Sequence, residues 1–171
     1  MQFHFSTDTP KELVFERVAE YLNQQGLKII NEDSSRPWGG FFVLDESDAE
    51  KFISLYFSHL TKEDLTIAGK LSPKILVVAP NQRLSWQYHF RRAEIWKLIG
   101  GVAAVVTSDT DEEKETTVLK IGDIIQLEQG ARHRLVGLKG WGIVAEIWRH
   151  TTESNPSDED DIVRLQDDFG R

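Results

Sequence analysis

The 171-residue sequence contains no cysteine, so it can form neither disulfide bonds nor a thiolate zinc site. Any metal site must therefore use histidine, carboxylate or amide ligands. Positive charge is also scarce, because 20 lysines and arginines stand against 28 acidic residues, for a formal net charge of −8. This balance argues against a nucleic-acid-binding protein, which would present a basic face. Local clusters of arginine can still bind small anions.

Long apolar runs are missing as well. The first residues, MQFHFSTDTPKE, contain neither the basic segment nor the apolar stretch of a secretory signal. No run in the chain approaches the length of a membrane span. We therefore expect a cytoplasmic protein without a nucleic-acid or membrane partner, and the chain length predicts a single structural domain overall.

Two segments in the first third of the chain have helical periodicity. Apolar residues recur at three- and four-residue spacing over 9–25, and Thr9 is the expected N-cap of that helix. A second helix is expected over 47–60, with Ser47 or Asp48 as its cap.

Beyond Pro73 the pattern changes to short runs rich in β-branched and aromatic residues. Turn-forming pairs such as Pro-Asn, Gly-Gly and Lys-Gly separate these runs. Six to eight strands at such spacing indicate a sandwich or a barrel. The acidic stretch over 151–161 has the composition of a solvated linker, which by itself favours disorder.

One of the expected strands, RLSWQYHF, carries several polar side chains. Alternate residues of a strand point to the same side, so Gln87 and His89 project together. Arg83 and Ser85 share that face. An antiparallel barrel would place His133, which follows a glycine turn, opposite this strand.

Glu94 can reach the same point across a hairpin. Two imidazoles, a carboxylate and an amide oxygen then form a mixed nitrogen and oxygen set that suits zinc, iron, manganese, nickel or cobalt. The alternative is structural, because a lone histidine such as His133 is more often a core residue than a ligand, and a lone strand glutamate is usually exposed. Spacing alone leaves both interpretations open.

Four motifs follow one another along the chain: RPWG at 36–39, PNQRLSWQYHFRRAEI at 80–95, GDIIQLEQGARHRL at 122–135 and EDDIVRLQDDFGR at 159–171. In this order they resemble the cupin domain of type II mannose-6-phosphate isomerases. That family includes the isomerase part of bifunctional enzymes that also make guanosine-diphosphate-mannose. The resemblance implies a mainly β cupin fold, a double-stranded β-helix or jelly-roll barrel, over 36–171. Residues 1–35 would form an N-terminal helical extension, and the C-terminal tail would pack back on the barrel.

The resemblance also implies ligands and substrate contacts. The family carries its metal at positions that match Gln87, His89, Glu94 and His133. One divalent metal is implied, zinc above all, with manganese, cobalt, nickel or iron as alternatives. The expected catalytic residues are Arg92, Glu94, Arg164 and Arg171, and the expected substrate-binding residues are Lys70, Lys74, Arg83 and Ser85. A glycine–lysine pair of the family is matched by Gly69 and Lys70.

The sequence departs from the family pattern at five positions. Phe90 and Arg91 replace histidines, Ile95 replaces the histidine after the glutamate, Glu128 replaces a proline and Asn81 a glycine. Mannose-6-phosphate is therefore one candidate among several phosphorylated sugars.

The function expected from the resemblance is metal-dependent aldose–ketose isomerisation of a small-molecule sugar phosphate. A homodimer is one expected assembly of the chain. The metal would act as a Lewis acid, and the general base is either Glu94 or a metal hydroxide. The alternatives are a non-catalytic sugar-binding cupin and an iron cupin oxygenase. The glutamine in place of a third histidine disfavours the oxygenase.

Overall fold

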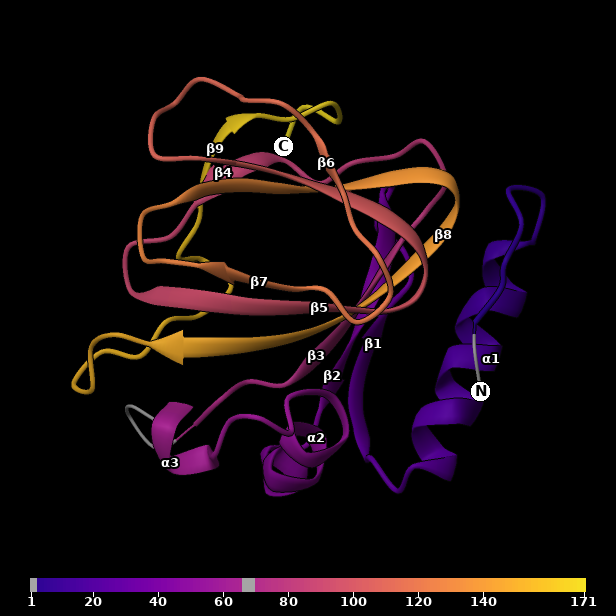
Figure 1. Cartoon of the computed structure of the whole chain (residues 1–171), viewed down its shortest axis with the longest axis horizontal. Helices are drawn as coiled ribbons and strands as arrows, with labels where there is room; N and C mark the ends of the chain where they lie inside the picture. Colours follow the sequence, from indigo (N-terminus) through magenta and orange to yellow (C-terminus); the bar gives the residue numbers. More distant parts are fainter. Residues whose placement is uncertain (1–2, 66–69) are drawn as a thin grey trace.

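Antiparallel β-strands dominate the computed structural model, which describes residues 3–65 and 70–171 (Figure 1). The helical elements are α1 (Lys11–Gln24), a short 3-10 turn (Glu46–Asp48), α2 (Ala49–Tyr56) and α3 (Lys62–Leu65). The strands are β1 (Ile29–Asp33), β2 (Gly39–Leu44), β3 (Lys74–Val78), β4 (Trp86–Tyr88), β5 (Arg92–Ser108), β6 (Thr117–Val118), β7 (Ile124–Leu127), β8 (Arg132–His150) and β9 (Val163–Gln166).

The strands form one sheet that curls on itself around the long pair β5 and β8. One path runs β1-β2-β3-β8-β4-β9, and β5 pairs with β6, β7 and β8. The β5–β8 ladder extends from the pair Arg92–His150 to the pair Ser108–Arg132 and is interrupted by bulges around Gly100. Bulges bend a strand and increase its twist, which lets a long hairpin follow a barrel wall. The predicted mainly β barrel is confirmed.

The sheet separates two apolar cores, and strand β3 shows how. Ile75 and Val77 face the core under the helices, whereas Leu76 and Val78 face the interior of the barrel. All five residues of β3 are buried. A strand covered on both faces is expected to read as a continuous apolar run, which explains why this segment does not alternate in sequence.

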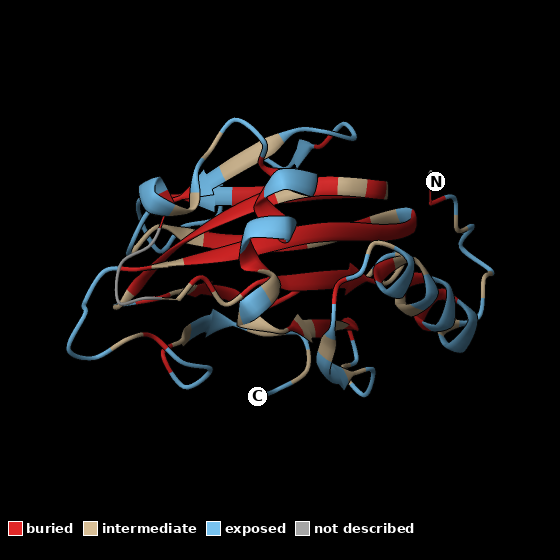
Figure 2. Ribbon diagram, turned by 90° about the horizontal axis from the view of Figure 1, so that it is seen from below, coloured by how far each residue is buried: buried red, intermediate tan, exposed pale blue. Residues whose placement is uncertain are grey.

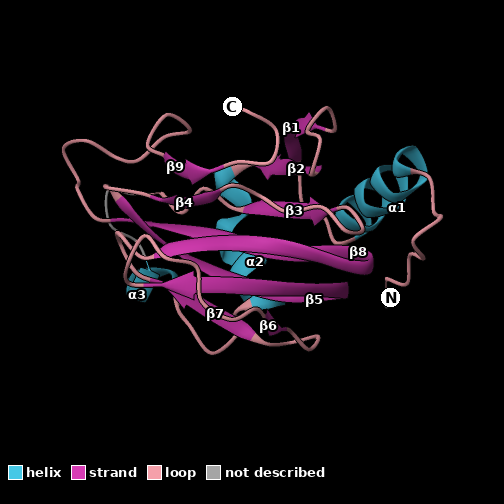
Figure 3. Ribbon diagram, turned by 90° about the horizontal axis from the view of Figure 1, so that it is seen from above, coloured by secondary structure: helices cyan, strands magenta, loops and turns pink. Residues whose placement is uncertain are grey.

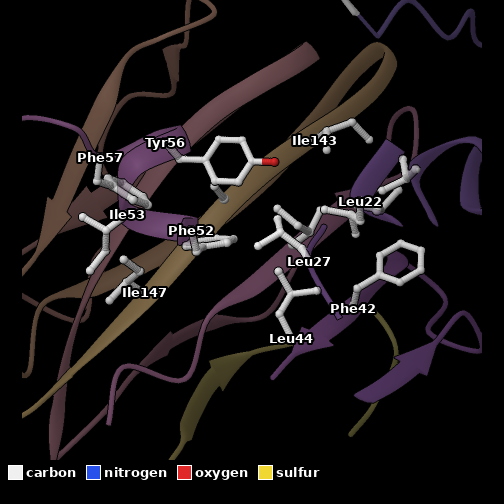
Figure 4. Packing of buried hydrophobic residues seen from close by; sticks show 14 of the residues in the cluster. Leu22, Leu27, Phe42, Leu44, Phe52, Ile53, Tyr56, Phe57, Ile143 and Ile147 are labelled. Carbon is white, nitrogen blue, oxygen red and sulfur yellow. The ribbon is translucent and has the colours of Figure 1, made fainter. Parts of the chain in front are cut away.

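Helices α1 and α2 lie on the outer face of the sheet (Figure 3). Figure 4 shows Leu22 of α1 and Phe52 of α2 among side chains from the strands, including Phe42 and Ile147. Figure 2 shows that the long strands are mostly buried, whereas the helices expose their outer surfaces. Each fully buried side chain of this size contributes about 1.5–3 kcal/mol.

The helix starts differ from the sequence prediction. Helix α1 begins at Lys11, and Pro10 occupies its N-cap position without a side-chain cap, so the prediction for Thr9 is wrong. Asp48 stands before α2, but its carboxylate accepts a hydrogen bond from the backbone N–H of Lys28 instead of capping the helix. The cap of this region is Asp45, which accepts from the backbone N–H of Ser47.

Two strand boundaries also differ. The Lys-Gly pair at 139–140 was expected to separate strands, but it lies inside β8, whose length is set by its pairing with β5. The strand expected around RLSWQYHF is reduced to β4, preceded by one isolated bridge between Arg83 and Val136.

The C-terminal tail packs back on the barrel, as the family resemblance implies. Strand β9 pairs with β4, and Ser157 and Asp161 are buried. The fully buried Arg134 donates hydrogen bonds to Glu113 and to the side-chain oxygen of Gln166. The disorder that the composition of the tail favours is therefore wrong, because Asp158 and Glu159 of the tail pair with Arg91 and Lys74.

The predicted boundary between residues 35 and 36 falls between β1 and β2, which pair with each other. It stays a prediction. In the described parts of the chain, no helix has the length and apolar character needed to cross a membrane.

We predict that Gly101→Ala strongly destabilises the fold. Gly101 has φ of +69°, and an added Cβ would lie 1.8 Å from the carbonyl oxygen of Trp141. The backbone would have to move, in addition to a left-handed strain of about 1–2 kcal/mol. The matched control is Gly130→Ala, at φ of +79° with nothing within 4 Å of the added Cβ. Chemical denaturation should give a clearly larger loss of unfolding free energy for Gly101→Ala, and equal losses would contradict this account.

Candidate metal centre

Three buried side chains from different parts of the barrel meet at one point. His89 follows β4, Glu94 lies in β5 and His133 lies in β8. One ligand atom from each residue lies within 4.8 Å of the other two, and all three residues are at most 2% exposed. The strand pairing creates this meeting point, because Gln87 lies directly opposite His133 and a short turn carries the chain from His89 to Glu94.

Backbone carbonyl groups fix the orientation of both imidazole rings. The Nδ1 atom of His89 lies 2.6 Å from the carbonyl oxygen of Asp161, and that of His133 lies 2.9 Å from the carbonyl oxygen of Ala131. Because a carbonyl oxygen only accepts hydrogen bonds, each Nδ1 carries the proton and donates it. In the neutral rings, Nε2 is then the unprotonated nitrogen.

Both Nε2 atoms face the carboxylate of Glu94. His89 Nε2 lies 3.1 Å from Oε1, and His133 Nε2 lies 3.4 Å from Oε2. In the described structure, Oε2 of Glu94 and Nε2 of His133 have no hydrogen-bond partner. Leaving a buried polar atom unpaired costs about 1–3 kcal/mol. A divalent cation would satisfy these atoms together, and the hydrogen-bonded Nδ1 groups are typical of metal-binding histidines.

The carboxyl group of Glu94 is held in its ionised form. Burial alone would raise its pKa, but the positive charge around it, which includes the guanidinium group of Arg92, holds the pKa well below its usual range. Arg92 donates from Nε to Oε1 of Glu94 over 2.8 Å. An ionised carboxylate is the form that binds a metal.

Gln87, the fourth predicted ligand, is buried and lines a cavity together with Glu94. Its side-chain oxygen accepts a hydrogen bond of 2.5 Å from the hydroxyl of Ser85. The amide oxygen, two imidazoles and a carboxylate form a nitrogen and oxygen donor set that suits zinc and neighbouring divalent metals.

Glu94 and Gln87 line a cavity of about 420 Å³. Its lining is rich in charge and in aromatic rings. The cationic residues are Arg36, Lys74, Arg92, Arg164 and Arg171, the acidic ones are Glu94, Glu146, Glu159 and Asp160, and the aromatic ones are Trp38, Phe41, Trp96 and Trp148. Ser85, Gln87, Leu76, Leu84 and Ile162 complete it.

Most of the predicted catalytic and substrate-binding residues meet at this cavity, but two of them do not line it. Lys70 lines a neighbouring pocket of about 290 Å³, which shares Lys74 with the main cavity. Arg83 pairs with Asp168 at 2.6 Å, away from the metal cluster. Gly69 lies outside the described residues.

The residues that depart from the family pattern lie apart from the cavity. Phe90 is exposed, and Arg91 pairs with Asp158 at 3.1 Å on the tail. Ile95 is packed in the outer core under the helices. In the described structure none of these three residues lines the cavity.

Several cations of the cavity already have partners. The ammonium group of Lys74 pairs with Glu159 and lies 3.8 Å from the centre of the Trp148 ring. The guanidinium group of Arg92 lies 3.7 Å from the same ring centre. Arg171 pairs with Asp167 at 2.9 Å. The tail therefore neutralises part of the positive charge.

Sequence reasoning missed Glu146, Trp148 and Asp161 as site residues. Glu146 is the one acidic residue in the apolar run GIVAEIW, which is a signal that the sequence does contain. Asp161 holds the turn after His89, because its carboxylate accepts from the backbone N–H groups of Phe90 and Arg91. Its acidic surroundings in the sequence hide that role.

The fold and the histidine–glutamate cluster define the class of this protein as a cupin barrel with a candidate metal centre. Among solved structures, the capsular polysaccharide assembling protein CapF from Staphylococcus aureus is similar with a TM-score of 0.53 and 10% identity, over 80% of this chain and 34% of CapF. A recombinant oxalate oxidase in complex with glycolate is similar with a TM-score of 0.51 and 17% identity, over 78% of this chain and 58% of that one. At these identities the likeness establishes the fold alone.

Sequence comparison identifies the family. The family described as "Mannose-6-phosphate isomerase C-terminal" matches residues 61–167, and the chain belongs to it. The alginate biosynthesis protein AlgA of Pseudomonas aeruginosa is 28% identical over 73% of this chain, and the xanthan biosynthesis protein XanB of Xanthomonas campestris is 27% identical over 80%. The mannose-1-phosphate guanylyltransferase ManC of Salmonella typhimurium is 26% identical over 80%. The chain spans about a quarter of the length of these relatives.

The buried His150 forms a hydrogen bond with the tail. Nδ1 of His150 accepts from the backbone N–H of Ser157 over 3.0 Å, so its proton lies on Nε2, which donates to the hydroxyl of Ser72 over 3.2 Å. Burial, followed by the charges of Lys70 and Arg92, lowers the pKa of His150 to about 4.

This shift predicts a loss of stability in acid. The unfolded chain binds a proton at His150 below about pH 6.5, whereas the folded chain does so only near pH 4. The contribution of His150 to the unfolding free energy is fully present above pH 6.5. It falls by on the order of 3 kcal/mol as the pH decreases toward 4. The unfolding free energy of His150→Asn should therefore change less between pH 7 and pH 5 than that of the wild type. The exposed His59 gives the control His59→Asn, and parallel profiles for all three proteins would contradict the assignment.

Proposed function

We propose that the protein is a metal-dependent isomerase that interconverts an aldose phosphate and a ketose phosphate. The observation that carries the proposal is the buried cluster of His89, Glu94 and His133, of which Glu94 lines a cavity together with five cationic side chains. The family description supports the reaction class.

Gln87, His89, Glu94 and His133 would hold one divalent metal, for which zinc is the first choice. When bound, the ion would act as a Lewis acid on the two substrate oxygens between which the carbonyl group moves. The chain's own residues would orient the sugar and exclude water. The aromatic rings of Trp38 and Trp148 offer apolar faces for the sugar carbons.

The cationic side chains would bind the phosphate group. Arg164 and Arg171 come from the tail, and a guanidinium group can bind a phosphate through two parallel hydrogen bonds. Lys74 adds a buried positive charge. The substrate would replace the carboxylates of Glu159 and Asp167 as partners of Lys74 and Arg171.

The relatives support a mannose phosphate as the first substrate to test. One of them is named a mannose-1-phosphate guanylyltransferase, and the family carries the name of mannose-6-phosphate. The charged lining disfavours the iron oxygenase, which would need an apolar substrate pocket. A cytoplasmic location and a homodimer stay predictions.

The proposal is tested by incubating the zinc-loaded protein with phosphorylated hexoses, pentoses and heptoses and with the corresponding free sugars. We expect nuclear magnetic resonance to detect a ketose product from at least one aldose phosphate and none from the free sugar. His133→Ala should lose most of its zinc and lower turnover at least about 100-fold while keeping its circular dichroism spectrum, because one ligand and its place in the cluster are removed.

The control for this variant is His59→Ala, since His59 is exposed and lies outside the cavity lining. A fully zinc-loaded wild-type protein that converts none of these sugar phosphates would refute the proposed function. Full zinc occupancy in His133→Ala would refute the proposed ligand set.

A further inference from the structure

Glu146 is a buried carboxyl group of the cavity that neither the metal ligands nor the phosphate contacts account for. It lies on β8, is 5% exposed and lines the cavity together with Glu94. Its Oε1 accepts a hydrogen bond of 2.9 Å from the indole N–H of Trp96. Trp148 lies two residues further along the same strand and faces the same cavity.

The neighbours of Glu146 leave its charge without an ion-pair partner. In the sheet it stands between Lys74 of β3 and Trp96 of β5, which are its register partners. The ammonium group of Lys74 turns to Glu159 of the tail instead. Across the described residues, no ion pair within 4.0 Å includes Glu146. Burial without a fixed cation disfavours the charged form of a carboxyl group, so its protonated form becomes accessible near neutral pH.

Glu94, the other buried carboxyl group of the cavity, is not available for proton transfer. Its oxygens face His89, His133 and Arg92, all within 3.4 Å. These groups keep it ionised, as a ligand must be. The base that isomerisation requires therefore has to be another group of the same cavity.

The surroundings of Glu146 favour its protonated form. Burial, and then the negative charge of Glu94, raise the pKa of Glu146 to about 8, against the opposing effects of Lys74, Arg92 and the Trp96 hydrogen bond. A carboxyl group whose pKa lies near the working pH can act as a general acid or base.

We propose that Glu146 is the catalytic residue that carries the proton between the two reacting carbons of the sugar phosphate. This role rests on the proposed isomerase function and names the residue that performs its central step. Glu146 would touch the substrate from the barrel wall, in the cavity that it shares with Gln87, Glu94 and the cationic side chains.

The step balances without a further reactant. The carboxylate of Glu146 takes the proton from C2 of the open-chain aldose, and the C2–H electron pair becomes the second bond between C1 and C2. The carbonyl electron pair moves to O1, which takes up a proton, while O2 loses its hydroxyl proton. Glu146 then returns its proton to C1, and the C2–O2 carbonyl group forms. The net change moves one hydrogen from C2 to C1 and one from O2 to O1.

Two substitutions test this role in the zinc-loaded, full-length protein. Glu146→Gln keeps the size of the side chain and an oxygen that can accept from Trp96, but it cannot take up the proton. We expect its zinc content and its affinity for the sugar phosphate to stay within about 3-fold of the wild type, and its turnover to fall at least about 100-fold. Exchange of the C2 hydrogen with deuterium oxide should fall in parallel.

The second variant, Glu146→Ala, leaves space that a small carboxylate can occupy. Added formate should restore its turnover at least about 10-fold, which a purely structural role would not explain. The control is Glu153→Gln, a change at an exposed position outside the cavity lining that should leave turnover unaltered.

The outcomes separate this proposal from the one on which it rests. If the wild type isomerises a sugar phosphate and Glu146→Gln does so at a similar rate, the role of Glu146 is overturned and the function stands. Loss of zinc from both variants would also overturn it, since Glu146 would then belong to the metal site. If the zinc-loaded wild type converts no sugar phosphate, the proposed function fails and this role fails with it.

Discussion

The structure depends on the contact between two unprotonated imidazole nitrogens and one buried carboxylate. In the absence of a cation, this contact places acceptor atoms against each other, and two of them have no hydrogen-bond partner in the described structure. The barrel tolerates it because the rings are held from behind by the carbonyl groups of Asp161 and Ala131. A fold would not retain such an arrangement for stability, since unpaired buried acceptors weaken it. The arrangement is therefore best explained by a ligand that it is built to bind.

This contact makes the tail part of the centre. The carbonyl of Asp161 fixes the ring of His89, and the carboxylate of the same residue fixes the turn that follows. Ser157 links Asp161 to Arg92, which in turn contacts Glu94. A segment that brings arginines to the cavity thus also orients a ligand, and closing the cavity and ordering the metal cluster are coupled.

The apolar core on the outer face of the sheet allows the inner face to carry the charged residues of the cavity. Helices α1 and α2 cover the outer face of β2, β3 and β8, so these strands bury apolar side chains on that face. The inner face of β8 can then present Glu146 and Trp148 to the cavity without loss of the sheet. The apolar burial that stabilises the chain and the polar site that serves its function use opposite faces of the same strands.

Strand spacing in the sequence indicated a sandwich or a barrel and left the metal cluster open, and the family resemblance then implied the cupin barrel and its ligands. Gln87 and His89 alternate along a strand, and Glu94 follows across a short turn. The order of the tail was harder to predict from composition, because it depends on pairing with residues far away in sequence, such as Arg134. Arg83 was predicted on the ligand face, but it turns to Asp168, a partner that only the position of the tail reveals. The helix cap at Thr9 failed because Pro10 already fits the position before the helix.

The central claim is that His89, Glu94 and His133 are ligands of one divalent metal, and X-ray absorption at the zinc edge of the loaded protein tests it most directly. We expect a first shell of nitrogen and oxygen atoms only, at roughly 2.0–2.2 Å. We also expect the outer-shell scattering of two imidazole rings, reduced to one ring in His89→Ala. A spectrum of zinc bound by oxygen atoms alone, without imidazole scattering, would contradict it.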